Sequence, residues 1–272
     1  MKFDWVGSFN NGFARVGLSS KYNFIDAQGK LLLNQWFDFV GSFNNGFATV
    51  KLNNQYNFID KKGNMLLNQW FDAVYGFDNG FAVVKLNDKW NYIDSKGNIL
   101  SNQWFDGAWN FNADFARVRS NDKRNFIDTK GNIISNQWFD GAWNFNNGFA
   151  VVKLNDKWNF IDTKGNILSN CWFDDAWNFN DGFARVRLND KYNFIDAQGK
   201  LLLNQWFDFV GSFNDGFATV KLNNQWNYID KKGNILSNQW FDDAWSFRDG
   251  FTRVRLNDKW YNIDKNGDLK GL

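Results

Sequence analysis

Short stretches in which apolar and polar residues alternate run through the chain, separated by Asn, Asp and Gly. Residues 183–188 read Phe-Ala-Arg-Val-Arg-Leu, and residues 191–196 read Lys-Tyr-Asn-Phe-Ile-Asp. Alternation with a period of two indicates β-strands. The two intervening residues, Asn189 and Asp190, tolerate the positive φ that the preferred two-residue hairpin turn requires. The pattern therefore predicts a β-hairpin over residues 183–196.

Two further strands are predicted before the pattern starts again. Residues 196–199, Asp-Ala-Gln-Gly, are typical of a type I turn followed by a left-handed Gly. A third strand is predicted over residues 201–204. A fourth covers residues 206–213 and turns at Asn214-Asp215-Gly216 into the next hairpin. Because every connection has hairpin length, each unit is predicted to be an antiparallel meander.

The unit recurs with a period of 34 residues and without any insertion or deletion. Its Ile-Asp pair ends at Asp26, Asp60, Asp94, Asp128, Asp162, Asp196, Asp230 and Asp264. Helical tetratricopeptide repeats share this period, but the chain lacks their 3.6-residue periodicity. Residues 21–55 and 191–225 differ only by Asn45 against Asp215, which indicates recent duplication. Eight units fill residues 1–272, and we expect a single repeat domain.

Both faces of the predicted sheets are apolar. Ala184 and Val186 lie on one face of the hairpin, whereas Phe183, Tyr192 and Phe194 lie on the other. An antiparallel sheet in water usually keeps one polar face, so these sheets must stack on each other. A closed eight-bladed β-propeller and an open β-solenoid both achieve this. We favour the all-β propeller, because the chain starts inside a fourth strand and ends in a third, so the two ends complement each other.

The composition excludes several chemistries. The chain has no His, and all 29 of its acidic residues are Asp. Without His there is no imidazole base, no Ser-His-Asp or Cys-His catalysis and no His-ligated metal. Cys171 is the only Cys and cannot form an intramolecular disulfide or a thiolate metal site alone. We therefore expect no enzyme activity, no cofactor and no bound metal.

Charge and hydropathy limit the possible partners. With 31 Lys and Arg against 29 Asp, the formal net charge is +2, too small to indicate a nucleic acid or a membrane surface as partner. No apolar run approaches the roughly 18 residues of a membrane span, and the first residues lack the apolar region of a signal peptide. We expect a soluble protein, with its compartment and oligomeric state left open.

One segment resembles a known family of repeats. Residues 157–166 read Lys-Trp-Asn-Phe-Ile-Asp-Thr-Lys-Gly-Asn, followed by Trp-Phe-Asp at 172–174 and Phe-Asn-Asp-Gly-Phe-Ala at 179–184. This order is similar to the bacterial WG repeat family, and the resemblance covers all eight units. It implies β-repeats without catalytic chemistry. Asn159 stands where the family has Gly after Trp, and we expect Asn there to take the positive φ of that Gly.

Two aromatic series are predicted to belong to the core. The first consists of seven invariant Trp, at positions 36, 70, 104, 138, 172, 206 and 240. The second supplies one ring from either of two positions two residues apart, as in Phe209 with Gly211 and Trp245 with Asp243. Positions i and i+2 share a strand face, so this exchange keeps one volume filled. Both series are therefore expected to pack inside.

A third aromatic series supplies the candidate binding residues. Each ring follows a hairpin Lys or Gln, and Arg124 in the fourth unit indicates a partly exposed position. Rings beside Lys, Asn and Asp suit a sugar ring or a loop of a protein partner. Structural packing is the alternative, and Arg185 and Arg187 are predicted to make cation–π contacts across the hairpin. The candidate ligand-stacking residues are Tyr22, Tyr56, Trp90, Trp158, Tyr192, Trp226 and Trp260.

The remaining motifs are predicted to be structural. The Asp26 series is expected to cap hairpin turns, and the Asp38 series to anchor turns or strand ladders. Asp114, Ser120 and Arg124 depart from the pattern together, which indicates a weak fourth unit or a distinct surface there. The sequence as a whole predicts a non-catalytic multivalent binding module for a glycan or a protein ligand. A structural or surface-assembly repeat protein is the alternative.

Overall fold

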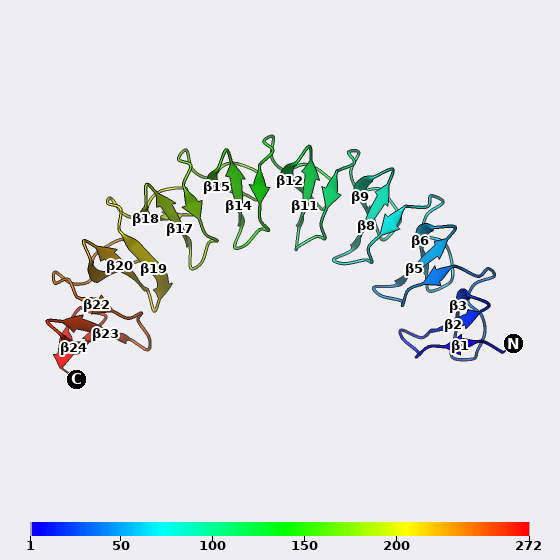
Figure 1. The fold of residues 1–272 in the computed structure, drawn as a ribbon, viewed down its shortest axis with the longest axis horizontal. Coiled ribbons are helices and arrows are strands. Elements are labelled where there is room, and N and C mark those ends of the chain that lie inside the picture. Colours follow the sequence, from blue (N-terminus) through cyan, green and yellow to red (C-terminus); the bar gives the residue numbers. More distant parts are fainter. Residues whose placement is uncertain (1, 272) are drawn as a thin grey trace. The chain divides into compact units, whose positions relative to one another are not determined.

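The computed structural model describes residues 2–271 (Figure 1). The chain divides into two compact halves, Met1–Trp138 and Phe139–Leu272, and each half contains four small antiparallel sheets. The predicted all-β fold of eight tandem units is confirmed. That the eight units behave as a single domain stays a prediction.

In the first half, each sheet has three strands in chain order. The strands are β1 Trp5–Val6, β2 Ala14–Leu18, β3 Lys21–Ile25, β4 Phe39–Val40, β5 Phe47–Leu52, β6 Gln55–Asp60, β7 Ala73–Val74, β8 Phe81–Leu86, β9 Lys89–Asp94, β10 Gly107–Ala108, β11 Phe115–Ser120 and β12 Lys123–Asp128. The second half repeats this arrangement and adds a fourth strand to its last sheet. Its strands are β13 Gly141–Ala142, β14 Phe149–Leu154, β15 Lys157–Asp162, β16 Asp175–Ala176, β17 Phe183–Leu188, β18 Lys191–Asp196, β19 Phe209–Asn214, β20 Phe217–Leu222, β21 Gln225–Asp230, β22 Asp243–Ala244, β23 Phe251–Leu256, β24 Lys259–Asp264 and β25 Leu269–Gly271.

The predicted hairpins form with the expected turn. β17 and β18 pair from Phe183 opposite Asp196 to Leu188 opposite Lys191. Asn189 and Asp190 have φ of 50° and 59°, and each of the eight hairpins has two consecutive non-Gly residues at positive φ. Two consecutive positive φ values define the turn whose twist matches that of the paired strands. The hairpin prediction is therefore confirmed.

The predicted third strand is wrong in seven units. The backbone of residues 201–207 pairs with β18 at the isolated bridges Ile195–Leu201 and Tyr192–Phe207 and through the Leu202 amide, which donates to the Phe194 carbonyl at 2.8 Å, but it forms no continuous ladder. The predicted fourth strand pairs with the hairpin of the following unit, as β19 does with β20. A unit is therefore a three-stranded sheet followed by a segment that runs beside its last strand.

Asn193 explains why this segment leaves the ladder. It lies in β18 opposite Val186, fully buried and without a positive φ, so the prediction that it replaces a left-handed Gly is wrong. Its Nδ2 donates to the carbonyls of Leu203 (2.9 Å) and Gln205 (3.3 Å), and its Oδ1 accepts from the Leu203 amide (3.2 Å). The side-chain amide of Asn193 thus makes the hydrogen bonds that a backbone peptide group would make in a regular sheet. The segment therefore lies further from β18 than a paired strand would. Buried equivalents are Asn23, Asn57, Asn91, Asn125, Asn159 and Asn227.

The eighth unit lacks the buried Asn, and its third strand forms. Its order at 260–262 is Trp-Tyr-Asn instead of Trp-Asn-aromatic, so Tyr261 stands where the other units have the buried Asn. Here the backbone pairs directly, with Tyr261 opposite Gly271 and Ile263 opposite Leu269, and β25 completes a four-stranded sheet. Removing the amide from this position restores the regular strand that the sequence pattern predicts.

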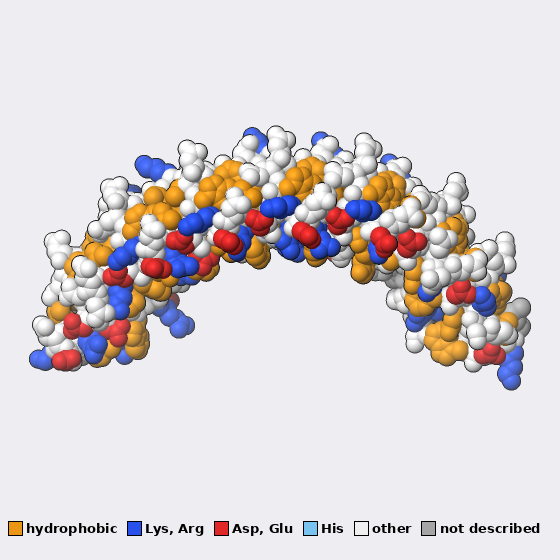
Figure 2. All heavy atoms as spheres, turned by 45° about the horizontal axis from the view of Figure 1, so that its top comes forward, with side chains coloured by type: hydrophobic (Ala, Val, Ile, Leu, Met, Phe, Trp, Pro, Cys, Tyr) orange, Lys and Arg blue, Asp and Glu red, His pale blue; other side chains and the backbone are white. Residues whose placement is uncertain are grey.

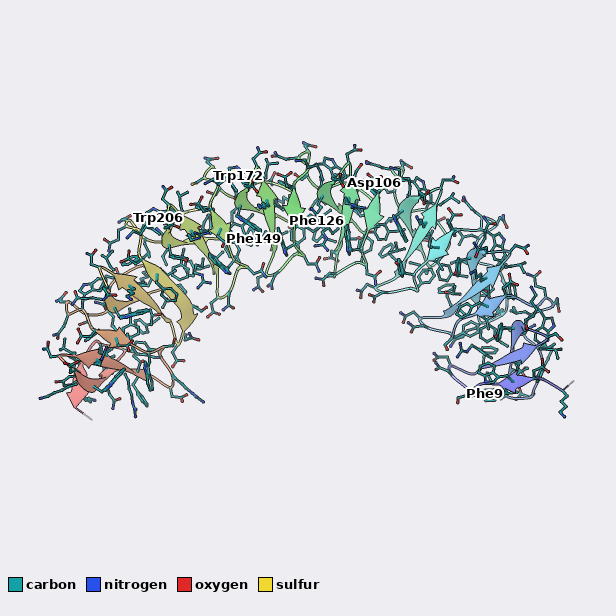
Figure 3. The ribbon with its side chains drawn as sticks, in the orientation of Figure 1. Phe9, Asp106, Phe126, Phe149, Trp172 and Trp206 are labelled. Atoms are coloured by element: carbon teal, nitrogen blue, oxygen red, sulfur yellow. The ribbon has the colours of Figure 1, made fainter. Side chains whose placement is uncertain are left out.

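Apolar clusters fill the space between consecutive sheets within each half. In one of them Phe194 of β18 packs with Ala218 and Val220 of β20. This confirms that both faces of a sheet are covered by neighbours. The invariant Trp series lies at the edge of these clusters and is half-buried rather than fully buried, as for Trp172 and Trp206, which take equivalent positions in successive units (Figure 3). The next residue, such as Phe207 at 1% exposure, fills the core instead.

Candidate ligand-binding surface

The second aromatic series is exposed, which corrects the prediction that it fills the core. Trp143 is 43%, Phe209 36% and Trp245 54% exposed. Phe209 pairs with Lys221, two residues before the hairpin turn of β20 and β21, whereas the core cluster contains Val220 and Ala218, which lie further from the turn. The exchange between two positions therefore keeps one ring per unit on the surface, near the hairpin turn.

These exposed rings contact the predicted ligand-stacking residues. In the second half the centroid distances are 4.7 Å for Trp143–Trp158, 6.1 Å for Trp177–Tyr192, 6.3 Å for Tyr192–Phe209, 5.6 Å for Phe209–Trp226 and 5.5 Å for Trp245–Trp260. In the first half Tyr75 stacks on Trp90 at 5.6 Å with an interplanar angle of 17°. We call the eight residues of the second half the aromatic ladder. Rings from two series alternate along it, and only one of the two was predicted to bind a ligand.

Cations lie over the rings, but in a different pairing from the predicted one. Lys153 lies 5.5 Å from the centroid of Trp158, directly across the hairpin. Arg185 instead covers Trp177 at 4.2 Å, in the second series. Its neighbour Arg187 turns to Asp190, with 3.1 Å between Nη1 and Oδ1. The prediction that Arg185 and Arg187 cover the hairpin ring is therefore wrong, because Arg185 lies over Trp177 and the Arg187 guanidinium is drawn to Asp190.

The other predicted residues have individual surroundings. Tyr56 lies under Lys51, with 5.0 Å from Nζ to the ring centroid. Arg124 is half-buried opposite Arg119, which fits the partial exposure that its charge indicates. Tyr22 lines a cleft with Trp5. No comparable feature of the sequence singles out the second series, because aromatic residues beside Gly are equally typical of a core.

Buried Tyr hydroxyls hold part of the ladder in place. Tyr228 stands where most units have Phe, and its hydroxyl donates to the Trp245 carbonyl at 2.7 Å. Tyr92 makes the same bond to the Trp109 carbonyl at 2.7 Å. Burial raises the pKa of both phenols, so each remains a protonated donor at neutral pH. The backbone beneath an exposed ring is thereby fixed from the core side.

The Asp residues serve as anchors, as predicted. Asp208 Oδ2 accepts from the Asn223 amide at 2.7 Å, and its Oδ1 forms an ion pair with Lys191, which lowers the pKa of this carboxyl. Asp196 Oδ1 accepts from two amides of its turn, at Gln198 (2.9 Å) and Lys200 (2.9 Å). Figure 2 shows Asp side chains beside Lys and Arg in successive units. Among the described residues, no group of three or more acidic, His or Cys side chains could hold a metal ion.

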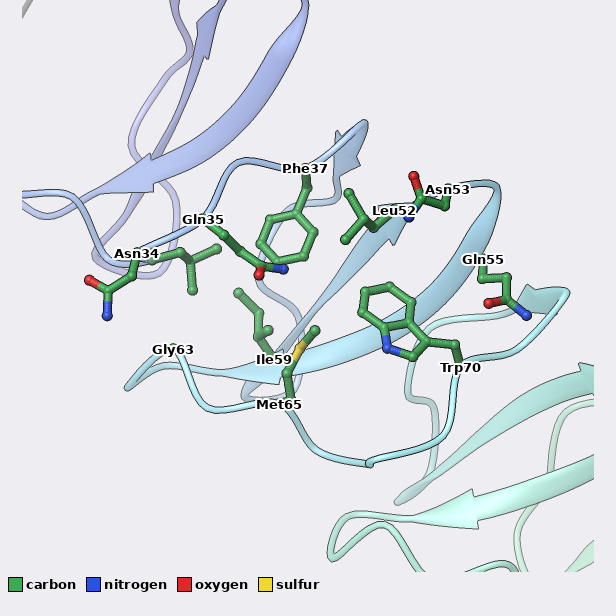
Figure 4. A pocket seen from close by; sticks show the side chains of 11 residues that line it. Asn34, Gln35, Phe37, Leu52, Asn53, Gln55, Ile59, Gly63, Met65 and Trp70 are labelled. Carbon is green, nitrogen blue, oxygen red and sulfur yellow. The ribbon is translucent and has the colours of Figure 1, made fainter.

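A second hollow lies between segments of the first half (Figure 4). It encloses about 770 Å³ and is lined by Trp70, Leu52 and Met65 together with polar side chains such as Asn34 and Gln55. Trp70 packs on the neighbouring core cluster and is half-buried, so this hollow offers little free ring surface. The aromatic ladder therefore carries more of the exposed aromatic surface.

Fold and surface define an all-β tandem-repeat protein whose units display aromatic rings covered by cations. The family model "WG containing repeat" matches residues 1–22, 24–56, 58–90, 92–123, 126–158, 160–192, 194–226 and 228–260. The chain therefore belongs to the family of WG-containing repeat proteins, as its resemblance implied. A comparison with curated proteins gives no match.

Solved structures that match the chain include Hsv2p from Kluyveromyces lactis and apo AztD from Citrobacter koseri. Hsv2p is 10% identical with a TM-score of 0.32, over 83% of this chain and 92% of that one. AztD is 13% identical with a TM-score of 0.32, over 95% and 93%. That the eight units close into a ring stays a prediction. No helix among the described residues is long and apolar enough to cross a membrane.

Proposed function

We propose that the chain is a non-catalytic, multivalent binding module and that its aromatic ladder binds a glycan. The observation that carries the proposal is the contact between exposed and half-buried rings in successive units, as in Trp177, Tyr192, Phe209 and Trp226. A sugar ring presents C–H groups on its faces and hydroxyls at its edge, so it matches an aromatic face flanked by polar groups.

Repetition supports a polymeric ligand. A single stacked ring contributes about 0.5–1.5 kcal/mol, which is too little for useful affinity alone. Several ladder residues that bind consecutive sugars of one chain raise the overall affinity, because the first contact increases the effective concentration of the next sugar. The cations over the rings, such as Lys153 and Lys221, place hydrogen-bond donors beside the stacking surface.

The absence of His and the roles of the Asp residues support a function without catalysis. Carboxylates such as Asp196 and Asp208 accept hydrogen bonds from backbone amides, which ties them to turns. Near-identical units also offer no unique constellation of acid, base and nucleophile, which an active site needs. We expect no hydrolase or transferase turnover. Turnover that disappears on changing one Asp of one unit would contradict this part of the proposal.

A glycan array tests the proposal directly. The wild-type chain is expected to bind at least one polysaccharide, and a triple variant with Trp143→Ala, Phe209→Ala and Trp245→Ala is expected to bind it at least tenfold more weakly. Tenfold equals about 1.4 kcal/mol, which three lost stacking contacts exceed. Ile235→Ala is the matched control, because Ile235 is an exposed apolar residue outside the ladder. Its affinity should stay unchanged.

Two results would contradict the proposal. If no glycan on the array binds, the ladder is not a glycan site. If the triple variant and Ile235→Ala bind equally well, binding occurs elsewhere on the chain. A triple variant that instead loses self-association would favour the structural or surface-assembly function.

A further inference from the structure

Gly17 in the first unit occupies a position that carries Lys or Arg in all seven other units. It lies on β2, opposite Trp5 of β1 on one side and Tyr22 of β3 on the other. The equivalent residues are Lys51, Lys85, Arg119, Lys153, Arg187, Lys221 and Arg255. In the first unit alone, the β2 position of this surface carries no side chain.

A second residue of the same surface changes together with Gly17. Ser20 ends the hairpin turn at a position where five units have Asp. In those units the Asp pairs with the cation three residues earlier, as Asp88 does with Lys85 at 2.8 Å and Asp156 with Lys153 at 2.9 Å. Both members of this ion pair are missing from the first unit. Their joint loss removes both charged groups of this ion pair from the surface beside Tyr22.

The loss of the cation leaves the hairpin ring uncovered on this side. In the third unit Lys85 Nζ lies 5.6 Å from the centroid of Trp90. In the first unit, only the backbone of Gly17 lies across from Tyr22. A Cβ atom at Gly17 would lie 3.5 Å from Tyr22 Cε1, in ordinary contact, so the backbone itself does not exclude a longer side chain.

A cleft of about 580 Å³ opens at this place, and Trp5, Tyr22 and Phe39 line it. Its volume falls within the range of about 300–1,000 Å³ that small-molecule sites have. Trp5 and Phe39 are each 45% exposed, so a ligand could reach both rings. Strands β1 and β3 flank β2, which separates the positions of Trp5 and Tyr22 by about 10 Å, or two strand spacings. Because Trp5, Gly17 and Tyr22 are in register, both side chains project from the same face of the sheet.

The polar residues that line the cleft have protein partners for their charges. Asp4 Oδ2 accepts from the Ser19 amide at 2.8 Å, and Lys21 forms an ion pair with Asp38. Arg15 donates to a backbone carbonyl and lies over the Trp5 ring. No single sign of charge dominates this lining, which favours a neutral ligand over an anion.

We infer that this cleft is a binding site for a single neutral pyranose ring, held between Trp5, Tyr22 and Phe39. Asp4 and Lys21 then hydrogen-bond the hydroxyls at the edge of the sugar. The inference rests on the proposed function and deepens it, because it assigns a site to the first unit, where no cation enters the cleft. The equivalent cleft of the second unit is lined by Lys51 and is smaller, at about 450 Å³.

The second copy of the same segment supports the assignment. Residues 191–225 repeat residues 21–55 with one difference, yet Arg187 and Asp190 precede them instead of Gly17 and Ser20. There Arg187 lies across from Tyr192 and pairs with Asp190. The two copies thus share the Tyr and Phe walls, at Tyr192 and Phe209 in the second, whereas Asp175 replaces Trp5 and Arg187 fills the central position.

Variants at position 17 test the inference in the full-length chain. Cellohexaose, maltohexaose and chitohexaose are titrated by calorimetry, and at least one is expected to bind. Gly17→Lys with Ser20→Asp restores the ion pair of the other units and is expected to weaken binding at least tenfold. Ile99→Ala is the control, because Ile99 is an exposed apolar residue of the third unit that does not line the cleft. Its affinity should stay within twofold of wild type, and circular dichroism checks that each variant folds.

The outcomes separate this inference from the proposed function. If the Gly17→Lys, Ser20→Asp variant binds as tightly as the wild-type chain, the cleft is not the site, although loss of binding in the triple ladder variant would still support the ladder. If the triple ladder variant binds normally and the Gly17→Lys, Ser20→Asp variant does not bind, the result supports the cleft as the site. The same result contradicts the proposal that the aromatic ladder binds the glycan. If none of the three oligosaccharides binds the wild-type chain, the assignment to a neutral pyranose is wrong.

Discussion

Asn193→Ala tests the account of the side-chain amide that replaces a peptide group in the fold. Asn193 is fully buried, and its Oδ1 accepts from the amides of Phe194 (2.7 Å) and Leu203 (3.2 Å). Its Nδ2 donates to the Leu203 carbonyl at 2.9 Å. Both neighbouring residues are themselves buried. Alanine would leave these two amides and one carbonyl without partners.

The expected cost follows from these three groups. A buried backbone group that loses its partner costs about 1–3 kcal/mol, so the variant should lose at least about 3 kcal/mol of its free energy of unfolding. That is a large share of the roughly 5–15 kcal/mol that holds a typical domain together. The carbonyl of Gln205 adds little, because this residue is exposed and water can replace the bond.

Urea denaturation followed by Trp fluorescence measures this loss, and hydrogen exchange at the Leu203 amide localises it. Asn178→Ala is the control, because Asn178 is an exposed Asn of the preceding segment and should change stability by less than about 0.5 kcal/mol. If Asn193→Ala unfolds within about 0.5 kcal/mol of wild type, or if the Leu203 amide exchanges no faster, the amide does not hold the segment.

Three further predictions concern acid, the fourth unit and the shape of the chain. Ion pairs with Lys lower the pKa of Asp174 and Asp208 below the ordinary value of about 3.9, so the stability they contribute is complete above that value and is lost as the pH falls through the lower folded values. Acid titration of unfolding should therefore show a shallower decline when both are changed to Asn, and an unchanged decline would refute the role of these pairs. Asp114→Gly, Ser120→Leu and Arg124→Trp together should raise stability by about 1–3 kcal/mol, and an unchanged melting temperature would show that the fourth unit is not weak. Small-angle scattering of the monomer should give a compact disc if the units close into a ring, whereas an elongated rod would eliminate closure.

Much of the fold could be predicted from the sequence, because the period of two and the turn residues act locally. The hairpin at 183–196 depends on alternating side chains and on Asn189 and Asp190, and both signals lie within a few residues. The third strand could not be predicted, because its absence depends on hydrogen bonds between Asn193 and Leu203, ten residues further on. The family resemblance suggested a left-handed backbone for this Asn, whereas burial makes its side chain the functional part.

Only one of the two aromatic series of the candidate surface could be predicted from the sequence. The hairpin rings were found because Arg124 replaces one of them and indicates partial exposure. The rings of Trp143, Phe209 and Trp245 were assigned to the core, since constant volume beside Gly is equally consistent with a filled interior. Their exposure depends on where consecutive sheets touch, which no local pattern records. The cleft at Gly17 required the register of three strands.

Hydroxyl-radical footprinting with the glycan that the array identifies tests the ladder most directly. Mass spectrometry then reports the oxidation of each Trp with and without the bound glycan. Binding to the ladder predicts that Trp143 and Trp245 lose reactivity severalfold, while the half-buried Trp172 and Trp206 of the invariant series keep theirs. Protection of the invariant series with unchanged ladder rings would contradict the account.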